Sequence, residues 1–128
     1  MSNKQILNTT QAPAAIGPYN QAIRAGNTLY VSGQIPLVPE TMELIDSSVA
    51  DETHQVLKNV QAILQHAGYT FNDVVKASIF IANMDDFATI NEIYAQYFTE
   101  NQPARECVAV KTLPKNVNVE ISVVAWKE

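Results

Sequence analysis

Cysteine and histidine are scarce in this 128-residue chain, which contains one cysteine, Cys107, and two histidines, His54 and His66. A single thiol excludes an internal disulfide, so we expect a reducing, cytoplasmic setting. The histidines have no Cys or His partner at metal-ligand spacing, and the four glycines are isolated rather than grouped in a phosphate-binding loop. We therefore expect neither a metal nor a cofactor.

Positive charge is also scarce, since 8 Lys and Arg stand against 13 Asp and Glu, and the net charge is -5. The basic residues are scattered, so no basic stripe can neutralise a phosphate backbone, and nucleic acid is not an expected partner. No hydrophobic run approaches the roughly 20 residues that span a bilayer. The first residues also lack a basic-plus-apolar signal segment, so neither a membrane partner nor export is expected.

The composition that remains is typical of a globular protein, with 47% hydrophobic residues. A chain of this length suits one core, so we predict a single domain over residues 1–128. Hydrophobic periodicity and turn residues predict the order strand, strand, helix, strand, helix, strand, strand. The predicted strands are 20–25, 29–33, 73–82, 107–113 and 117–126, and the predicted helices are 47–69 and 84–98.

Both predicted helices carry end signals. Ser47 or Ser48 can cap the first helix and Gly68 can end it, while Asp85 or Asp86 can cap the second. Helical spacing predicts one buried face on each: Val49, Val56, Val60, Ile63 and Ala67 on the first, and Phe87, Ile90, Tyr94 and Tyr97 on the second.

This order of elements indicates an α+β fold with two helices on one face of a sheet. The strand at 73–82 is expected to place apolar side chains on both of its faces, and two helices can cover only one of them. The apolar residues are Val74, Val75, Ala77, Ile79, Phe80 and Ile81. A second copy of the chain is the simplest cover for the other face, so we predict a homo-oligomer.

Arg105 is a candidate anion-binding residue, because it follows a turn at Pro103 and shares a strand face with Cys107. A guanidinium beside small side chains can bind a carboxylate through two parallel hydrogen bonds. The alternative is a solvated arginine paired with an acid such as Glu106, which strand parity places on the opposite face. Cys107 lies near a cation and so invites interpretation as a nucleophile, but a small thiol packed in a strand is usually inert.

Glu120 is the second candidate, because it stands within an otherwise apolar strand. Either it lies on a wet face with Asn118 and Ser122, or it belongs to a site that raises its pKa towards that of a useful base. The sequence pattern leaves both interpretations open.

Three other polar residues also have two interpretations. Tyr19 lies in a loop, where it can cover a pocket or simply pack. Ser32 precedes Gly33 at a strand end, where hydroxyls often only cap a turn. Asn91 lies in the middle of a predicted helix, where solvation is the ordinary state.

Five segments, taken together, carry a resemblance to a known family: "APAAIGPYNQA", "YVSGQIP", "DDFATINEIY", "PARECVAV" and "LPKNVNVEI". In order and spacing they resemble the RidA (YjgF) family of reactive intermediate imine deaminases, from about residue 8 to residue 125. The Pro-Ala-Arg segment and the Val-Glu-Ile downstream of it are the most specific parts.

The resemblance implies a chorismate-mutase-like (ferredoxin-like) fold, assembled as a homotrimer whose sheets form a central barrel with three clefts between subunits. It also implies hydrolysis of the enamine and imine products of PLP-dependent dehydratases, such as 2-aminoacrylate/2-iminopropanoate and 2-iminobutanoate. The products would be 2-keto acids and ammonia, and no cofactor would be required.

The resemblance also implies roles for single residues. Arg105 would hold the substrate carboxylate, and Glu120 would orient or activate the attacking water. Tyr19 would close over the pocket, Ser32, Gly33 and Asn91 would line it, and Cys107 would contribute backbone groups near the imine nitrogen.

Two features depart from the family pattern and bear on substrate range. Glu106 occupies a position where the family usually carries Ser or Thr, and the "TENQ" loop before Pro103 is short and lacks the usual aromatic residue. A non-catalytic trimer that binds a small carboxylate and regulates a partner protein is the alternative function. Glu120 favours catalysis, because divergent family members keep the arginine and lose the acid. A ribonuclease function is poorly compatible with the negative net charge of the chain.

Overall fold

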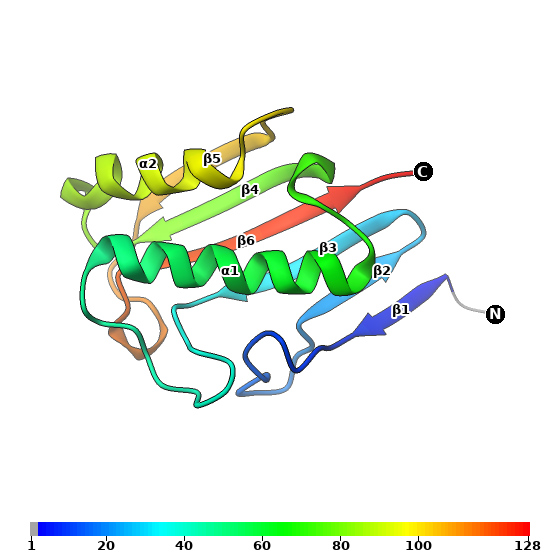
Figure 1. Ribbon diagram of the computed structural model, residues 1–128, viewed down its shortest axis with the longest axis horizontal. Coiled ribbons are helices and arrows are strands. Elements are labelled where there is room, and N and C mark those ends of the chain that lie inside the picture. Colours follow the sequence, from blue (N-terminus) through cyan, green and yellow to red (C-terminus); the bar gives the residue numbers. More distant parts are fainter. Residues whose placement is uncertain (1–2) are drawn as a thin grey trace.

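Strands β3, β6 and β4 form the centre of a six-stranded sheet in the computed structural model, which describes residues 3–128 (Figure 1). The strand order is β1-β2-β3-β6-β4-β5, and neighbouring strands are antiparallel except β4 and β5, which are parallel. The strands are β1 Lys4–Leu7, β2 Ala22–Ala25, β3 Thr28–Gln34, β4 Val74–Ile81, β5 Ala104–Ala109 and β6 Val119–Trp126, and the α-helices are α1 Val49–Ala67 and α2 Phe87–Tyr97.

Both α-helices cover the same face of the sheet, so the predicted α+β arrangement of two helices on one sheet is confirmed (Figure 1). Their apolar faces pack on the helix-facing side chains of β3, β4 and β6 and form the main core. Among its most deeply buried members are Leu29, Leu57, Ile63, Leu64, Ile79, Ile81, Ile90, Phe98 and Ile121. No helix within residues 3–128 has the length and apolarity needed to cross a membrane.

The predicted end signals of α1 are confirmed. The Oγ of Ser48 accepts a hydrogen bond from the N–H of Asp51 at 3.0 Å. Gly68 ends the helix with a φ of 86°, in the left-handed region that glycine adopts without a steric penalty. On the predicted buried face, Val56, Val60, Ile63 and Ala67 are buried and Val49 is partly buried.

The predicted cap of α2 is right in position, at Asp86, but the capping hydrogen bond is absent. A 3-10 turn, Met84–Asp86, precedes the helix, and the side chain that caps this turn is Asn83, whose Oδ1 accepts from the N–H of Asp85 at 2.9 Å. Asp86 holds the cap position of α2 but has a near-helical backbone, with φ -86° and ψ -3°, and its side chain makes no capping bond. A capping side chain normally needs an extended backbone at that position.

Two strands also differ from the prediction. β1 was not predicted, because its four residues are too few to show a recognisable alternation of polar and apolar side chains. Three of the four are exposed in the structure. The strand predicted at 107–113 is β5, which begins at Ala104 and ends at Ala109. β5 precedes β6 in the chain, yet β4 lies between them in the sheet. Arg105 therefore lies within a strand, as its predicted shared face with Cys107 requires, and this strand is at the edge of the sheet.

The sheet face without helices carries both polar and apolar side chains, and most of its exposed apolar side chains do not come from β4. In β4, Ala77 and Ile79 are buried under the helices, whereas Lys76, Ser78 and Phe80 alternate onto the other face. The prediction that β4 places apolar side chains on both faces is therefore confirmed at Phe80, while Lys76 and Ser78 make the rest of its open face polar. Other strands supply the exposed apolar side chains of that face: Ile6 (59% exposed), Tyr30 (52%), Trp126 (46%) and Val108 (44%).

A buried acid, Glu52, links α1 to the segment before β6. Glu52 is 3% exposed, and its carboxylate accepts hydrogen bonds from the backbone N–H of Asn118 at 3.0 Å and from Asn118 Nδ2 at 2.6 Å. The backbone oxygen of Asn118 in turn accepts from the N–H of Ala82 at 3.0 Å, just after β4. Glu52 thus fixes the entry into β6, close to Glu120.

We predict that Glu52→Gln destabilises the protein. The amide would turn an N–H group towards a donor of Asn118 and leave a buried donor unpaired, which costs about 1–3 kcal/mol. Urea denaturation measures this change in the free energy of unfolding. Glu92→Gln, the same substitution at an exposed position of α2, is the matched control and should change it by less than about 0.5 kcal/mol. Equal effects of the two substitutions would contradict the role given to Glu52.

Candidate active site

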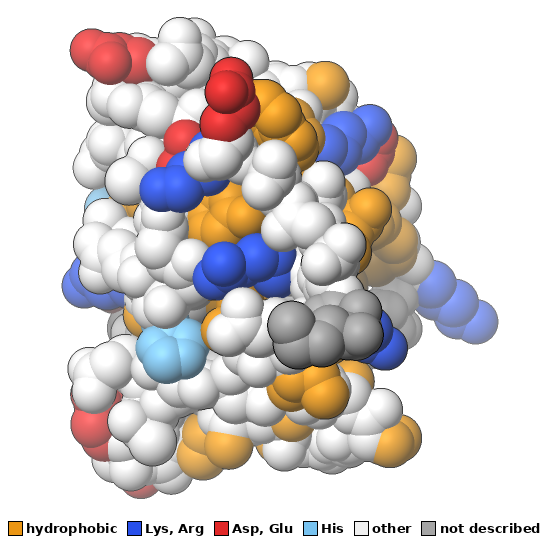
Figure 2. Space-filling view, turned by 90° about the vertical axis from the view of Figure 1, so that its right-hand side faces the viewer, with side chains coloured by type: hydrophobic (Ala, Val, Ile, Leu, Met, Phe, Trp, Pro, Cys, Tyr) orange, Lys and Arg blue, Asp and Glu red, His pale blue; other side chains and the backbone are white. Residues whose placement is uncertain are grey.

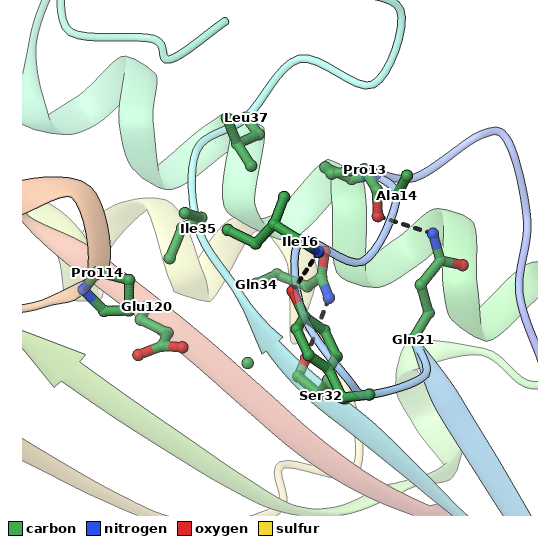
Figure 3. A pocket seen from close by; sticks show the side chains of 12 residues that line it. Pro13, Ala14, Ile16, Gln21, Ser32, Gln34, Ile35, Leu37, Pro114 and Glu120 are labelled. Carbon is green, nitrogen blue, oxygen red and sulfur yellow. Dashed lines mark hydrogen bonds between the residues drawn. The ribbon is translucent and has the colours of Figure 1, made fainter. Parts of the chain in front are cut away.

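A pocket of about 430 Å³ opens beside β3 and β6 on the side of the sheet that the helices leave free. Figure 3 shows Glu120 on β6, between Pro114 and the β3 residues Ser32 and Gln34. The lining is more apolar than polar, and Glu120 is its one acidic residue. The lining residues are Pro13, Ala14, Ile16, Tyr19, Gln21, Ser32, Gly33, Gln34, Ile35, Leu37, Pro114 and Glu120.

The Glu120 carboxyl is half-buried in this pocket. Burial raises the pKa of Glu120 above its ordinary value. Within residues 3–128 the carboxylate has no hydrogen-bond or ion-pair partner that would oppose this effect. A carboxylate that is partly desolvated and unpaired is a better proton acceptor at neutral pH than a solvated one.

An irregularity in β3 makes room for this carboxylate. Val31 pairs with Val123 and Gln34 pairs with Ile121, so Ser32 and Gly33 together face the single residue Ser122. Such bulges redirect side chains and are common beside active sites. A Cβ on Gly33 would overlap the Glu120 carboxylate and lie 2.9 Å from its Cδ, so only glycine fits the present position of Glu120.

Ser32 and Tyr19 line the same pocket. The Ser32 hydroxyl donates to the backbone oxygen of Asn20 at 2.6 Å, so in this structure it fastens the loop beside the pocket. Tyr19 is exposed, and its hydroxyl accepts from the backbone N–H of Ile16 at 3.3 Å. This contact folds the Tyr19 ring back on the loop that forms one wall.

Gln21, which no sequence pattern singled out, anchors the start of the loop that carries Tyr19. It is 2% exposed, and its Nε2 donates to the backbone oxygens of Pro13 at 2.8 Å and Thr9 at 3.0 Å, with Ala12 at 3.2 Å. Its Oε1 accepts from the N–H of Thr9 at 2.7 Å. Gln21 lies just before β2, and the sequence gives no local signal for this role. Pro114, Ile35 and Gln34 give none, because their place in the pocket depends on long-range pairing.

Arg105, Asn91 and Cys107 lie elsewhere, at the edge strand β5 and on the helix-covered side of the sheet. The Nη1 of Arg105 donates to Asn91 Oδ1 at 2.7 Å. The guanidinium carbon lies 5.0 Å from the centroid of the Tyr94 ring and 5.8 Å from that of Phe87. Asn91 is therefore a partner of Arg105 rather than a lining residue of the Glu120 pocket.

One chain does not bring Arg105 and Glu120 together. Phe80 of β4 pairs with Glu120 on one side and with Val108 on the other, so β5 and β6 are separated by a strand. Arg105 lies three residues before Val108, which places the two backbones on the order of 14 Å apart. Their side chains also point to opposite faces of the sheet, because Arg105 pairs with the buried Ala77.

Cys107 does not have the surroundings of a nucleophile. It packs partly buried against the main core, and burial raises the pKa of its thiol although the Arg105 charge acts to lower it. A raised pKa reduces the thiolate fraction, and the thiolate is the reactive form. The inert interpretation of Cys107 is therefore favoured.

Glu106 points away from Arg105, as strand parity predicted. Its carboxylate pairs with Lys76 Nζ at 2.7 Å and accepts from the Ser78 hydroxyl, both on the open sheet face. These hydrogen bonds, first that of Lys76 and then that of Ser78, lower the pKa of Glu106. Its charge is thus balanced locally, so Glu106 is a weak source of repulsion for an acid bound at Arg105.

Among the described residues, metal-ligating side chains do not gather around Glu120 or around Arg105. In the part of the chain that the structure describes, no three His, Cys, Asp or Glu residues lie close enough to hold a metal ion.

Known proteins match this chain over nearly its whole length. A family model described as Endoribonuclease L-PSP matches residues 9–127. A RutC family protein of Pyrococcus horikoshii is 50% identical over 125 residues, covering 98% of this chain and 99% of that protein. A Mus musculus protein named 2-iminobutanoate/2-iminopropanoate deaminase is 46% identical over 122 residues, covering 95% and 90%. The solved structure of E. coli TdcF with bound serine has a TM-score of 0.92 and 43% identity, covering 97% and 99%.

We predict that Gly33→Ala displaces the Glu120 carboxylate into solvent and lowers its pKa towards the ordinary value. A carbon-13 NMR titration of the Glu120 carboxyl measures this. Because the folded protein binds this proton more tightly than the unfolded chain, stability falls as pH rises from the ordinary pKa through the raised one. That pH dependence should shrink in the variant.

Gly17→Ala is the matched control for this substitution, because a Cβ there would meet the Tyr19 ring at an ordinary 3.6 Å. An unchanged Glu120 pKa in Gly33→Ala, or an equal change in both variants, would contradict the role given to Gly33.

Proposed function

Given that the chain belongs to the RidA (YjgF) family, whose model carries the description Endoribonuclease L-PSP, we propose that it is a reactive-intermediate deaminase. Its substrates would be enamines and imines of small 2-amino acids, such as 2-aminoacrylate/2-iminopropanoate and 2-iminobutanoate. The products would be 2-keto acids and ammonia. The names of the mammalian relatives support this substrate class.

The observation that carries the proposal is the half-buried Glu120, which has no hydrogen-bond or ion-pair partner among residues 3–128, in a pocket of about 430 Å³. Hydrolysis of an imine needs a group that removes a proton from water, and a carboxylate with a raised pKa suits this task. An imine is intrinsically labile, so positioning and a single base are sufficient chemistry. Neither a cofactor nor a covalent intermediate is required.

In the proposed reaction, Glu120 accepts a proton from a water molecule as the oxygen of that water attacks the imine carbon. The new C–O bond forms while the C=N π electrons move to nitrogen, which takes up a proton. In the carbinolamine the hydroxyl proton then passes through Glu120 to the amine nitrogen, the C–N bond breaks, ammonia leaves, and the carbonyl of the keto acid forms. The Ser32 N–H already donates to the backbone oxygen of Gln21 at 2.9 Å, so the backbone of Gly33 would be the part of the bulge that binds the polar atoms of this intermediate.

Arg105 would bind the substrate carboxylate through two parallel hydrogen bonds. Since Arg105 and Glu120 of one chain point to opposite faces, we propose that each site combines Glu120 of one subunit with Arg105 of another. E. coli TdcF, a relative of known structure, has bound serine, a molecule with the α-carboxylate that this arrangement would hold. Tyr19, Ser32 and Gly33 would belong to the half of the site with Glu120, and Asn91 and Cys107 to the half with Arg105.

The assembly we propose is a homotrimer of single-domain subunits, residues 1–128, with a chorismate-mutase-like fold. The exposed Tyr30, Val108 and Trp126 on the open sheet face would be buried as three sheets close into a central barrel. A head-to-tail contact that closes after three copies creates three equal clefts. We propose a cytoplasmic location on the basis of the single cysteine.

A ribonuclease activity is less well supported, despite the description of the family model. The net charge is -5. Figure 2 shows Lys and Arg side chains dispersed over one end of the molecule rather than gathered in a stripe. Binding of a polyanion depends on clustered positive charge.

We predict that the purified protein accelerates keto-acid release when a serine or threonine dehydratase generates the imine in the same reaction. Arg105→Ala should lower kcat/KM by about 100-fold, because charge-assisted hydrogen bonds to the substrate are lost. Glu120→Gln should lower kcat by about 100-fold or more, because the base is lost. Cys107→Ala should keep much of the rate.

The alternative, a carboxylate-binding trimer without catalysis, predicts keto-acid binding with no acceleration by the wild type. Full activity of Arg105→Ala or Glu120→Gln would disprove the roles of those residues. Complete inactivity of a folded Cys107→Ala would restore the nucleophile hypothesis.

We predict further that two inactive variants complement each other when their subunits are mixed. In a trimer with sites between subunits, random mixing of Arg105→Ala and Glu120→Gln chains restores about a quarter of the sites, because each needs one intact residue from each neighbour. The measurement is activity after unfolding and refolding the mixture together, with separately refolded chains as the control. A sedimentation mass near one subunit, or no recovery in mixed trimers, would contradict the shared site.

A further inference from the structure

Three residues of α2 converge on the guanidinium of Arg105. Phe87, Asn91 and Tyr94 are spaced four and three residues apart, which places them on one face of the helix. Asn91 Oδ1 accepts from Arg105 Nη1 at 2.7 Å, and the Tyr94 and Phe87 ring centroids lie 5.0 and 5.8 Å from its guanidinium carbon. We call these three residues the arginine seat.

The seat is rigid because its deepest member is part of the core. Tyr94 is 5% exposed and stacks on Phe98, with ring centroids 4.2 Å apart and an interplanar angle of 16°. Phe98 in turn packs edge-on against Phe71 at 4.8 Å. The Tyr94 hydroxyl has no hydrogen-bond partner among residues 3–128, so the ring face is what Tyr94 offers to Arg105. A guanidinium is attracted to such a face.

Arg105 keeps most of its hydrogen-bonding capacity in this position. A guanidinium has five N–H donors, and Asn91 occupies one of them. The side chain is exposed, so the remaining donors are accessible to a carboxylate. A free arginine side chain loses much rotamer freedom when it binds a ligand, and an arginine already held in place loses less.

We propose that Phe87, Asn91 and Tyr94 are positioning residues that hold Arg105 ready for the substrate carboxylate. This proposal rests on the deaminase function, and it adds that the helix, rather than the substrate, orders the cation. The arginine seat acts on binding of the substrate carboxylate and does not affect proton transfer at Glu120. Its loss should therefore raise KM, and the Kd of a keto acid, while kcat at saturation stays close to that of the parent.

The test uses the full-length protein and 2-oxobutanoate, a keto acid that retains the carboxylate. Calorimetry gives its Kd, and nitrogen-15 NMR relaxation gives the order parameter of the Arg105 Nε–H bond. Asn91→Ala and Phe87→Leu should each weaken binding by about three- to tenfold and lower the order parameter. Phe87→Tyr, which keeps the ring, should retain more affinity than Phe87→Leu. Gln96→Ala, an exposed position on α2, is the control for helix stability.

A low Arg105 order parameter in the wild type would overturn the proposal, and so would a decrease in order without a loss of affinity. A change in kcat with an unchanged KM would also overturn it, because the seat would then act on the chemical step. If the wild type binds no keto acid, the proposed function fails as well. If it binds and the seat variants match Gln96→Ala, only the seat is disproved.

Discussion

Strand β6 is hydrogen-bonded along both edges, to β3 and to β4, and its side chains alternate between a closed face and an open one. Val119, Ile121 and Val123 lie under the helices and are nearly inaccessible, so β6 cannot shift its register without exposing them. The same constraint directs Glu120 to the open face. The position of the acid is thus a consequence of core packing on the other side of the strand.

Two features convert that position into a site. The bulge at Ser32 and Gly33 removes a side chain from the place that the carboxylate occupies. The loop held by Gln21 and Tyr19 then encloses the carboxylate enough to desolvate it in part. Desolvation without a counter-charge destabilises the ionised form, so this arrangement reduces stability at neutral pH and improves the base.

The elements of the fold could largely be predicted from local patterns, because caps and periodicity act over a few residues. Ser48 and Gly68 bound α1 as expected, whereas Asp86 at the start of α2 makes no capping bond, because a 3-10 turn capped by Asn83 precedes it. The alternation of side chains along a strand correctly placed Glu106 and Arg105 on opposite faces of the sheet. It could not show that β4 separates β5 from β6, since strand order depends on contacts between distant residues. The separation of Arg105 from Glu120, and the role of Gln21, were therefore beyond local reasoning.

The parallel pairing of β4 and β5 has a consequence for the order in which the two halves of the site form during folding. Arg105 and its three helix partners belong to the continuous segment β4, α2 and β5, so their contacts close short loops. The pocket around Glu120 joins residues 13–37 to Pro114 and Glu120, near the opposite end of the chain. Closing a long loop has the larger entropic cost, and contacts between distant residues generally form later. The half of the site that contains Arg105 can thus assemble early, and Glu120 becomes part of a pocket only after the chain is nearly complete.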